Sequence, residues 1–307
     1  MPRKNKYGNK YLFYQVLVYL ALILGVFTFI VIISILLGDD NYFVWGGGID
    51  LDIASKFGNF IGGFVGLFWL ISGVVMLFLV LMKQKDQAYH TQIETQFFNM
   101  ISHLNHIIES ITGTGYDENT YTTITSRKYL SYLFWKLHQD LAEDIENQIG
   151  NKDSAYYLLL HSLKSNPKRV FLQHGSGTDT DLDLLHKWIQ NVYGSFYNDN
   201  KSQLGHYFRY VYHIIKYIDN SRLPLRNKRE YIEIFQAQMM DDELGLLFYH
   251  GLSQTGEKKL KPLLEKYHFL YNIDIANLTF PPAESMLYPG IPFNFLEQYV
   301  KIGDNRQ

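Results

Sequence analysis

The chain has 307 residues, a formal net charge of −2 and no cysteine. The lack of cysteine excludes disulfides, thiol nucleophiles and thiolate metal sites. The nearly balanced charge leaves a nucleic-acid partner possible but gives it no support. Aromatic residues make up 16% of the chain, so many rings must be buried or must lie at lipid headgroups.

Two long apolar segments dominate the first quarter of the chain. Residues 1–10 form a basic tail, and residues 11–37 and 57–82 then carry no charged side chain. A membrane span needs about 20 apolar residues, whereas the apolar core of a secretory signal peptide has only about 7–15. The sequence therefore predicts two transmembrane helices, at 11–37 and 57–82, in contact with a lipid bilayer.

The charges that flank these segments predict the topology. The loop at 38–56 contains Asp39, Asp40, Asp50 and Asp52 but a single lysine. The outer flanks carry Arg3, Lys4, Lys6 and Lys10 on one side and Lys83 and Lys85 on the other. Because basic flanks stay in the cytoplasm, we expect a multi-pass protein with both termini cytoplasmic and an extracytoplasmic 38–56 loop.

Three glycines fall on one face of the second predicted span. Gly58, Gly62 and Gly66 are four residues apart, and small residues at this spacing let helix backbones approach closely in lipid. One interpretation is a homo-oligomer formed through this second span. The other is packing of the same face against the first span of the same chain.

The remainder is predicted to be all-α: a helical linker at 83–95 and a cytoplasmic helical domain at 96–307. Helices are expected at 96–111, 126–148, 153–164, 181–196, 204–220, 226–240, 241–252, 256–269 and 293–300. Gly113 and Gly115 are expected to end the first of these, and Asp241 is a candidate N-cap. No strand-like alternation persists beyond a few residues.

A basic stripe marks the 204–220 helix, which is otherwise apolar nearly all round. His206, Arg209, His213 and Lys216 recur at helical spacing. This pattern is typical of a site for an anionic ligand such as a phosphate group. It also fits a face in solvent, or one paired with Asp241, Asp242 and Glu243 of a neighbouring helix.

Other chemical signatures are weak or missing. His103 and His106 are three residues apart, but no third metal ligand follows from the sequence. The HGSGT segment at 174–178 lacks the lysine of a P-loop, and no hydrolase, zincin or kinase signature occurs. The sequence thus predicts no metal and no cofactor, and leaves an enzymatic activity open.

Three blocks together resemble the phage abortive-infection family called AbiC-like. They are TQFFNMISHLNHIIESI at 95–111, LGHYFRYVYHIIKYID at 204–219, and YIEIFQAQMMDDELGLLFYHGLS at 231–253, which leads into LLEKYHFL at 263–270. The order of two spans, a polar linker and these helices is also similar. Tyr207, Phe208 and Arg209 match one family run, and Gln238, Glu243 and Tyr249 match the next. Residues 112–200 match less clearly.

The resemblance implies a bacterial defence protein of the inner membrane that stops phage propagation by harming or arresting the infected cell. In that hypothesis the cytoplasmic domain senses a phage-derived or cellular trigger and alters the packing of the spans. A tethered nuclease that uses His206, Arg209 and His213 is the enzymatic alternative. A non-catalytic scaffold or sensor for a partner effector is the third.

Overall fold

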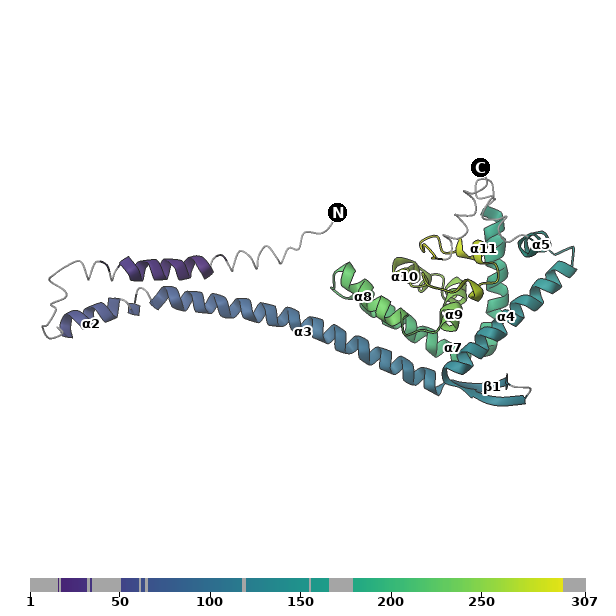
Figure 1. The fold of residues 1–307 in the computed structure, drawn as a ribbon, viewed down its shortest axis with the longest axis horizontal. Coiled ribbons are helices and arrows are strands. Elements are labelled where there is room, and N and C mark those ends of the chain that lie inside the picture. Colours follow the sequence, from purple (N-terminus) through teal and green to yellow (C-terminus); the bar gives the residue numbers. More distant parts are fainter. Residues whose placement is uncertain are drawn as a thin grey trace. The chain divides into compact units, whose positions relative to one another are not determined.

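The computed structural model describes residues 16, 18–31, 34, 51–60, 62–63, 66–117, 120–154, 156–165 and 179–294. The basic tail at 1–10, most of the 38–56 loop and the helix expected at 293–300 lie largely or wholly outside these residues. The chain divides into two units, residues 1–92 and 93–307, which are described separately below. The prediction of a mostly helical protein is confirmed (Figure 1).

The described residues of the first unit include three helical segments, of which the first and the last are apolar. They are Val18–Val31, α2 (Leu51–Phe60) and the N-terminal part of α3 (Gly66–Ser110). Among the described residues, α3 alone is long and apolar enough to cross a membrane, and Val18–Val31 is a shorter apolar helix. Within the span expected at 57–82, the structure describes α2 up to Phe60 and α3 from Gly66. Residues 61, 64 and 65 lie outside the described residues, so a single helix over the whole range stays a prediction.

The close approach within this unit falls on a glycine that the sequence reasoning did not select. A Cβ atom added to Gly25 would lie 2.8 Å from Nε1 of Trp69. A Cβ atom at Gly58 or Gly62 would have no described atom within 4 Å. Packing of this glycine face against the first helix therefore gains no support from the described residues, and its use in a homo-oligomer stays a prediction.

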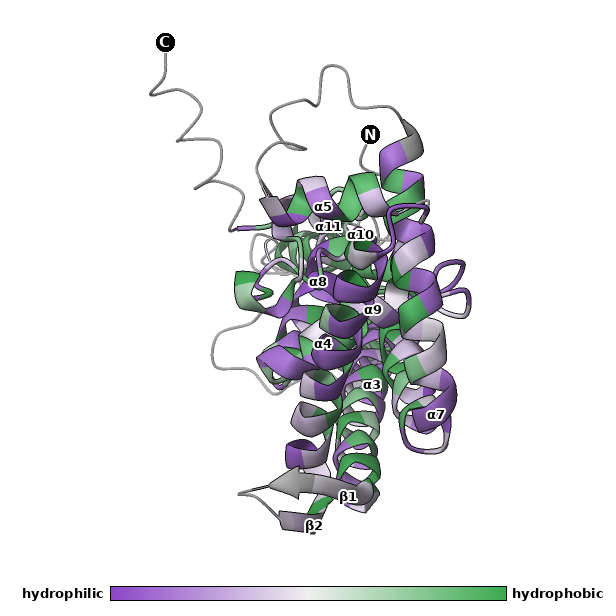
Figure 2. Ribbon diagram, turned by 90° about the vertical axis from the view of Figure 1, so that its right-hand side faces the viewer, coloured by the Kyte–Doolittle hydropathy of each residue, from purple (hydrophilic) through white to green (hydrophobic). Residues whose placement is uncertain are grey.

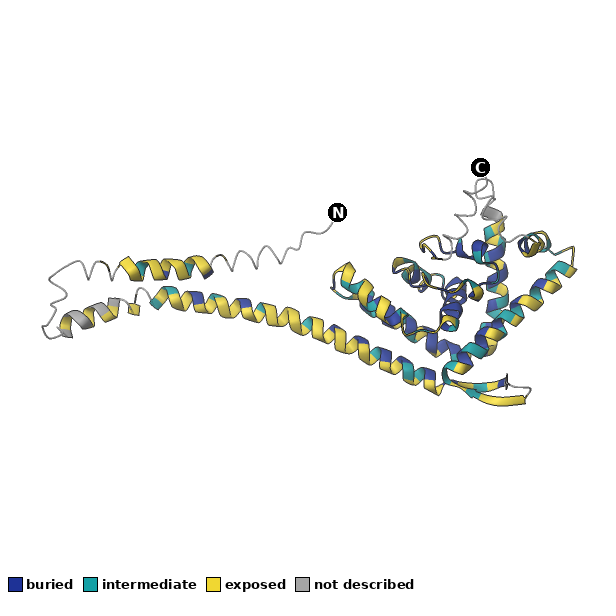
Figure 3. Cartoon of the chain, in the orientation of Figure 1, coloured by how far each residue is buried: buried dark blue, intermediate teal, exposed yellow. Residues whose placement is uncertain are grey.

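Helix α3 continues without a break from the apolar segment through the polar linker, as expected. Its residues 83–88 are exposed on every side, whereas a stripe beginning at Ile93 is buried (Figure 3). That stripe comprises Ile93, Phe97, Ile101, Leu104 and Ile108. The four- and three-residue spacing places these side chains on one face, and this face forms part of the core of the second unit.

A β-hairpin follows α3, where the sequence analysis expected no strand. Strand β1 (Thr112–Asp117) pairs antiparallel with β2 (Thr120–Thr125), with Thr112 opposite Thr125. Gly113 lies within β1, and a Cβ atom there would overlap the Tyr129 ring. Helix α3 does end just before these glycines, at Ser110. Gly113 and Gly115 alternate along β1 and leave a strand face on which the Tyr129 and Tyr132 rings pack, and the Thr-rich partner favours a strand.

The remaining helices form the rest of the second unit. They are α4 (Ser126–Gly150), α5 (Tyr157–Ser165), α7 (Asp179–Asn220), α8 (Leu225–Gln236), α9 (Asp241–Leu252), α10 (Lys261–Lys266), the short 3₁₀ helix η2 (Ile275–Asn277) and α11 (Pro281–Ser285). Figure 2 shows hydrophilic residues interspersed with hydrophobic ones along α4 and α8, as expected of helices that bury one face.

Two predicted boundaries differ from the structure for identifiable reasons. The helices expected at 181–196 and 204–220 are one helix, α7, because the buried side of the helix continues through Asn200 and Leu204. The Asn200 amide donates to the Phe196 carbonyl at 2.7 Å, so this buried polar group is satisfied within the helix. The helix expected at 256–269 is reduced to α10 between turns.

Helix α9 lies at the centre of the second unit. Every residue from Glu243 to Leu252 is buried, and α9 contacts α4, α7, α10 and η2. Gly245 leaves room for the Phe134 ring of α4, and Gly251 leaves room for the Tyr288 hydroxyl. A helix that is buried all round explains why this segment reads as almost continuously apolar.

Candidate functional site

Glu243, one of the predicted site residues, is the centre of a buried polar cluster. Its carboxylate pairs with Arg127 of α4 and accepts hydrogen bonds from the Tyr207 hydroxyl at 3.2 Å and the Met240 N–H at 2.8 Å. Burial raises the pKa of Glu243, and these three donors oppose that shift. Met240 rather than Asp241 is the N-cap of α9, so the expected cap was misplaced by one residue.

The Arg127 guanidinium extends this cluster to α3, since it also donates to the Asn105 side chain at 3.2 Å. The cluster thus joins side chains of α3, α4, α7 and α9. Tyr207 is fully buried, and burial next to Glu243 raises the pKa of its hydroxyl. Breaking such a partnered buried charge is costly, which gives Tyr207 and Glu243 a structural role.

Phe208, the next residue of the same family run, stacks on His250 of α9. The two rings are 3.8 Å apart between centroids and are tilted by 6°. Nδ1 of His250 is 3.1 Å from the hydroxyl oxygen of Tyr193. Burial lowers the pKa of His250 to about 3, so the imidazole is neutral near pH 7 and acts as a packed ring.

Tyr249 is held in the core by a buried acid. Its hydroxyl donates to Oε1 of Glu284 at 3.2 Å, and the Phe280 N–H donates to Oε2 at 3.0 Å. Glu284 has no exposed surface, and burial raises the pKa of its carboxyl to about 7. Glu284 could not be selected from the sequence, because it lies in the Pro-rich tail away from any periodic element.

The basic stripe is exposed, in contrast to these buried residues. His206, Arg209, His213 and Lys216 all lie on the solvent side of α7. Nε of Arg209 donates to the Gly205 carbonyl at 3.0 Å, and Nζ of Lys216 lies 5.2 Å from the centre of the Tyr212 ring. The stripe does not pair with Glu243, whose partner is Arg127. Use of this face by a nuclease stays a prediction.

Gln238 lies apart from both groups. It is exposed in the turn after α8, where its N–H donates to the Phe235 carbonyl at 3.1 Å. The six residues that match the family runs therefore divide into buried core positions (Tyr207, Phe208, Glu243 and Tyr249) and exposed positions (Arg209 and Gln238). They do not converge on one cavity.

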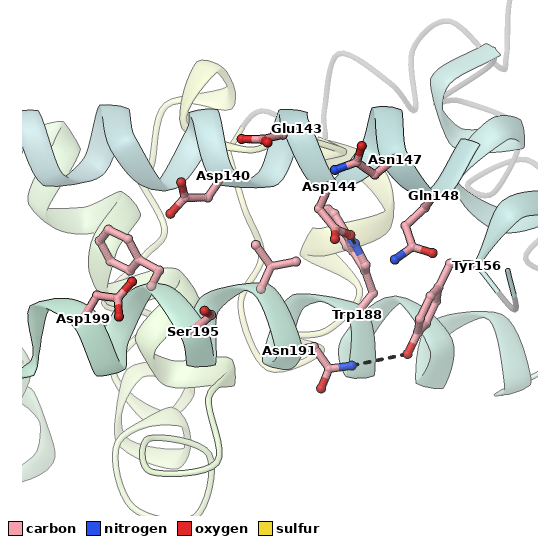
Figure 4. A pocket seen from close by; sticks show the side chains of 12 residues that line it. Asp140, Glu143, Asp144, Asn147, Gln148, Tyr156, Trp188, Asn191, Ser195 and Asp199 are labelled. Carbon is pink, nitrogen blue, oxygen red and sulfur yellow. Dashed lines mark hydrogen bonds between the residues drawn. The ribbon is translucent and has the colours of Figure 1, made fainter. Parts of the chain in front are cut away.

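The structure instead reveals an acidic pocket that the sequence reasoning missed. It lies between α4 and α7 and has a volume of about 390 Å³. Figure 4 shows Asp140 of α4 pointing towards α7, which contributes Ser195 and Asp199, and Glu143 of α4 also lines the pocket. Burial raises the pKa of Asp140, and the Glu143 and Asp199 carboxylates raise it further against the opposing effect of Lys136.

A short hydrogen bond joins two of the residues that line this acidic pocket. Nε1 of Trp188, which is buried, donates to Oδ2 of Asp144 at 2.6 Å. Asn191 donates to the Tyr156 hydroxyl at 3.5 Å across one end (Figure 4). The recurrence of Asp140, Glu143, Asp144 and Asn147 on one helix face was visible in the sequence, but its partner strip on α7 could not be assigned without the fold.

No group of three or more His, Asp or Glu side chains within the described ranges is arranged to hold a metal ion. His103 and His106 are exposed on α3, where His106 contacts Glu109 at 3.3 Å, and their rings are 6.5 Å apart between centroids. The candidate functional features of the described residues are therefore the buried polar clusters, the basic face of α7 and the acidic pocket.

Comparison with known proteins gives one match. Residues 199–278 match the family described as "Putative phage abortive infection protein", whereas no curated protein and no solved structure matches the chain. The matched segment spans the C-terminal half of α7, then α8, α9, α10 and η2. The predicted resemblance to the phage abortive-infection family is therefore confirmed over this segment, which holds the blocks at 204–219, 231–253 and 263–270.

Proposed function

We propose that this protein is a membrane-anchored effector of abortive infection, in which the helical second unit senses infection and α3 carries the response to the bilayer. The family match supports the defence role. The apolar composition of α3 and of Val18–Val31 supports an inner-membrane anchor of two spans. The basic residues that flank the two spans support a topology with both termini in the cytoplasm.

The observation that carries the proposal is the continuity of α3. One helix of 45 residues contains both the apolar segment and the buried stripe from Ile93 to Ile108. Packed helices switch between discrete arrangements rather than deforming gradually. A trigger that repacks this stripe would therefore shift or rotate the apolar part of the same helix.

The response of the membrane is proposed to be a change in span association that permeabilises it. Gly58 and Gly62 leave open space on their helical segments, and small residues of this kind allow close helix contacts in lipid. A second copy could occupy this space once the spans move. Loss of membrane potential would then arrest the infected cell.

The first experiment follows phage plating and membrane potential together in cells that express only this chain. A Gln87→Pro variant interrupts α3 in its fully exposed linker, where proline costs about 3 kcal/mol and kinks the helix. Protection and depolarisation should both be lost, whereas the matched Gln87→Ala variant should keep both. Protection by Gln87→Pro at the wild-type level would refute transmission through α3.

A second experiment tests the membrane step itself. Gly62→Leu should abolish depolarisation, and Gly63→Leu, which places the new side chain on a different side of the helix, should not, although a Cβ at either position has open space. Membranes that stay polarised while protection persists would refute permeabilisation but leave the defence role intact. Absence of protection by the chain alone would instead favour a sensor that serves a partner effector.

A further inference from the structure

We propose that α7 forms the interface of a two-fold symmetric dimer, in which the basic half of each α7 lies against the acidic pocket of the other copy. This interface lies within the second unit and does not rest on the proposed membrane response. The occupant of the exposed α7 face is thus a second copy of this chain.

The first argument is the continuity of one exposed stripe along α7. Its members are Val192, Ser195, Asp199, Ser202, His206, Arg209, His213 and Lys216, which alternate in steps of three and four residues. This spacing keeps side chains on one face of a helix. All of them except the half-buried Val192 are exposed, so no described part of the chain covers this face.

The second argument is the change of charge along the stripe. The N-terminal half, up to Asp199, lines the acidic pocket together with Asp140 and Glu143 of α4 (Figure 4). The C-terminal half carries Arg209 and Lys216. Within the described residues no salt bridge joins any of these five side chains to an opposite charge. The Lys136 charge acts on Asp140 without a salt bridge, so the charged side chains of each half are available to pair with those of the other half.

The third argument is the symmetry of these positions. Asp199 precedes Leu204 by five residues, and Arg209 follows it by five (204 − 199 = 209 − 204 = 5). If two α7 helices run antiparallel about an axis near Leu204, each Arg209 faces the Asp199 of the other copy. Such a contact is isologous and closes at a dimer. Both acidic pockets then receive a cationic partner.

A second copy explains the features better than a small cation. A metal ion finds no described group of three suitable ligands, and an organic cation in the pocket would leave the basic half of the stripe unmatched. The stripe from Val192 to Lys216 extends about 36 Å at 1.5 Å per residue. A small cation cannot extend over this length. A second α7 can, because its own acidic and basic halves are the same distance apart.

The test is cysteine crosslinking of the full chain in native membranes, where an introduced cysteine is the sole thiol of the chain because its sequence contains none. Ser202 is two residues from the proposed axis, so Ser202→Cys should place two thiols about 10 Å apart across the helix pair. A short bismaleimide should give a covalent dimer. Glu233→Cys, exposed on α8, is the matched control and should give none.

Charge reversal tests the pairing itself in the Ser202→Cys background. Arg209→Glu or Asp199→Lys alone should lower the crosslinking yield about tenfold, and the two together should restore it. Both side chains are exposed, so each variant should fold, and its elution in size-exclusion chromatography checks this. Yields equal to those of Glu233→Cys, or a double variant no better than the single ones, would overturn the proposal.

Discussion

Replacing Glu284 by glutamine should stabilise the protein at high pH and have little effect at low pH. In the unfolded chain this carboxyl has a pKa near 4.5, whereas in the folded protein burial raises it to about 7. Between these values the folded state holds one proton more than the unfolded state, so stability falls as the pH rises. At 1.36 kcal/mol per unit, the loss is about 3 kcal/mol by pH 8.

Glutamine resembles the protonated acid, because its side-chain oxygen accepts from the Phe280 N–H while its NH2 group donates to the Tyr249 hydroxyl oxygen. The assay is denaturant unfolding of the full chain in detergent micelles at pH 5 and pH 8, followed by tryptophan fluorescence. Glu284→Gln should exceed the wild type by only about 1 kcal/mol at pH 5 and by about 3 kcal/mol at pH 8. Glu233→Gln, on the exposed face of α8, is the control.

The opposite result would refute this reasoning. If Glu284→Gln is less stable than the wild type at pH 8 and equal to it at pH 5, the donors around the site favour the carboxylate. The three donor contacts, from Tyr249 and from the Phe280 and Thr279 backbones, would then outweigh desolvation. A difference that stays constant with pH would mean that the carboxyl does not titrate in this range.

Three further changes test the core contacts. Arg127→Leu should lower the free energy of unfolding by about 2 kcal/mol, because Glu243 loses its counter-charge. This loss is smaller than for a fully buried ion pair because Arg127 is partly exposed. Gly113→Val should cost about 1–3 kcal/mol, because the new side chain overlaps the Tyr129 ring, and should shift the thermal midpoint downward. His250→Phe should make stability less dependent on pH between 4 and 6.5, because the buried neutral imidazole no longer opposes folding as the pH falls.

Each of these has a contrasting outcome. Adding Glu243→Gln to Arg127→Leu should recover part of the lost stability, and no recovery would show that the pair does not act as a unit. Gly150→Ala, where a Cβ atom meets open space, should not destabilise as Gly113→Val does. An unchanged acid profile in His250→Phe would mean that other groups control acid unfolding.

Much of the helical fold could be predicted because helical burial leaves a period in the sequence. The stripe from Phe97 to Ile108 and the inward leucines of α4 identified both helices. The hairpin at 112–125 could not be predicted in this way. Its glycine face depends on the Tyr129 ring of a different element, and no local period records that contact.

The candidate residues show the same division. The spacing of His206, Arg209, His213 and Lys216 correctly placed them on one face, but their charge suggested a ligand site before the fold showed that the face is in solvent. Glu243 and Tyr249 are candidates from the sequence because they match a run of the phage abortive-infection family. Their partners, Arg127 and Glu284, come from distant segments and show that both polar side chains make contacts inside the protein.

By itself the sequence determined the apolar segments, the helical class and the family resemblance, because composition, periodicity and short motifs are local properties. Only the tertiary structure decided which polar residues are buried, where the strands form and where α4 and α7 enclose an acidic pocket. The reason is that burial and charge compensation depend on pairs of residues far apart in the chain. Arg127 and Glu243 are 116 positions apart, yet they share one hydrogen bond.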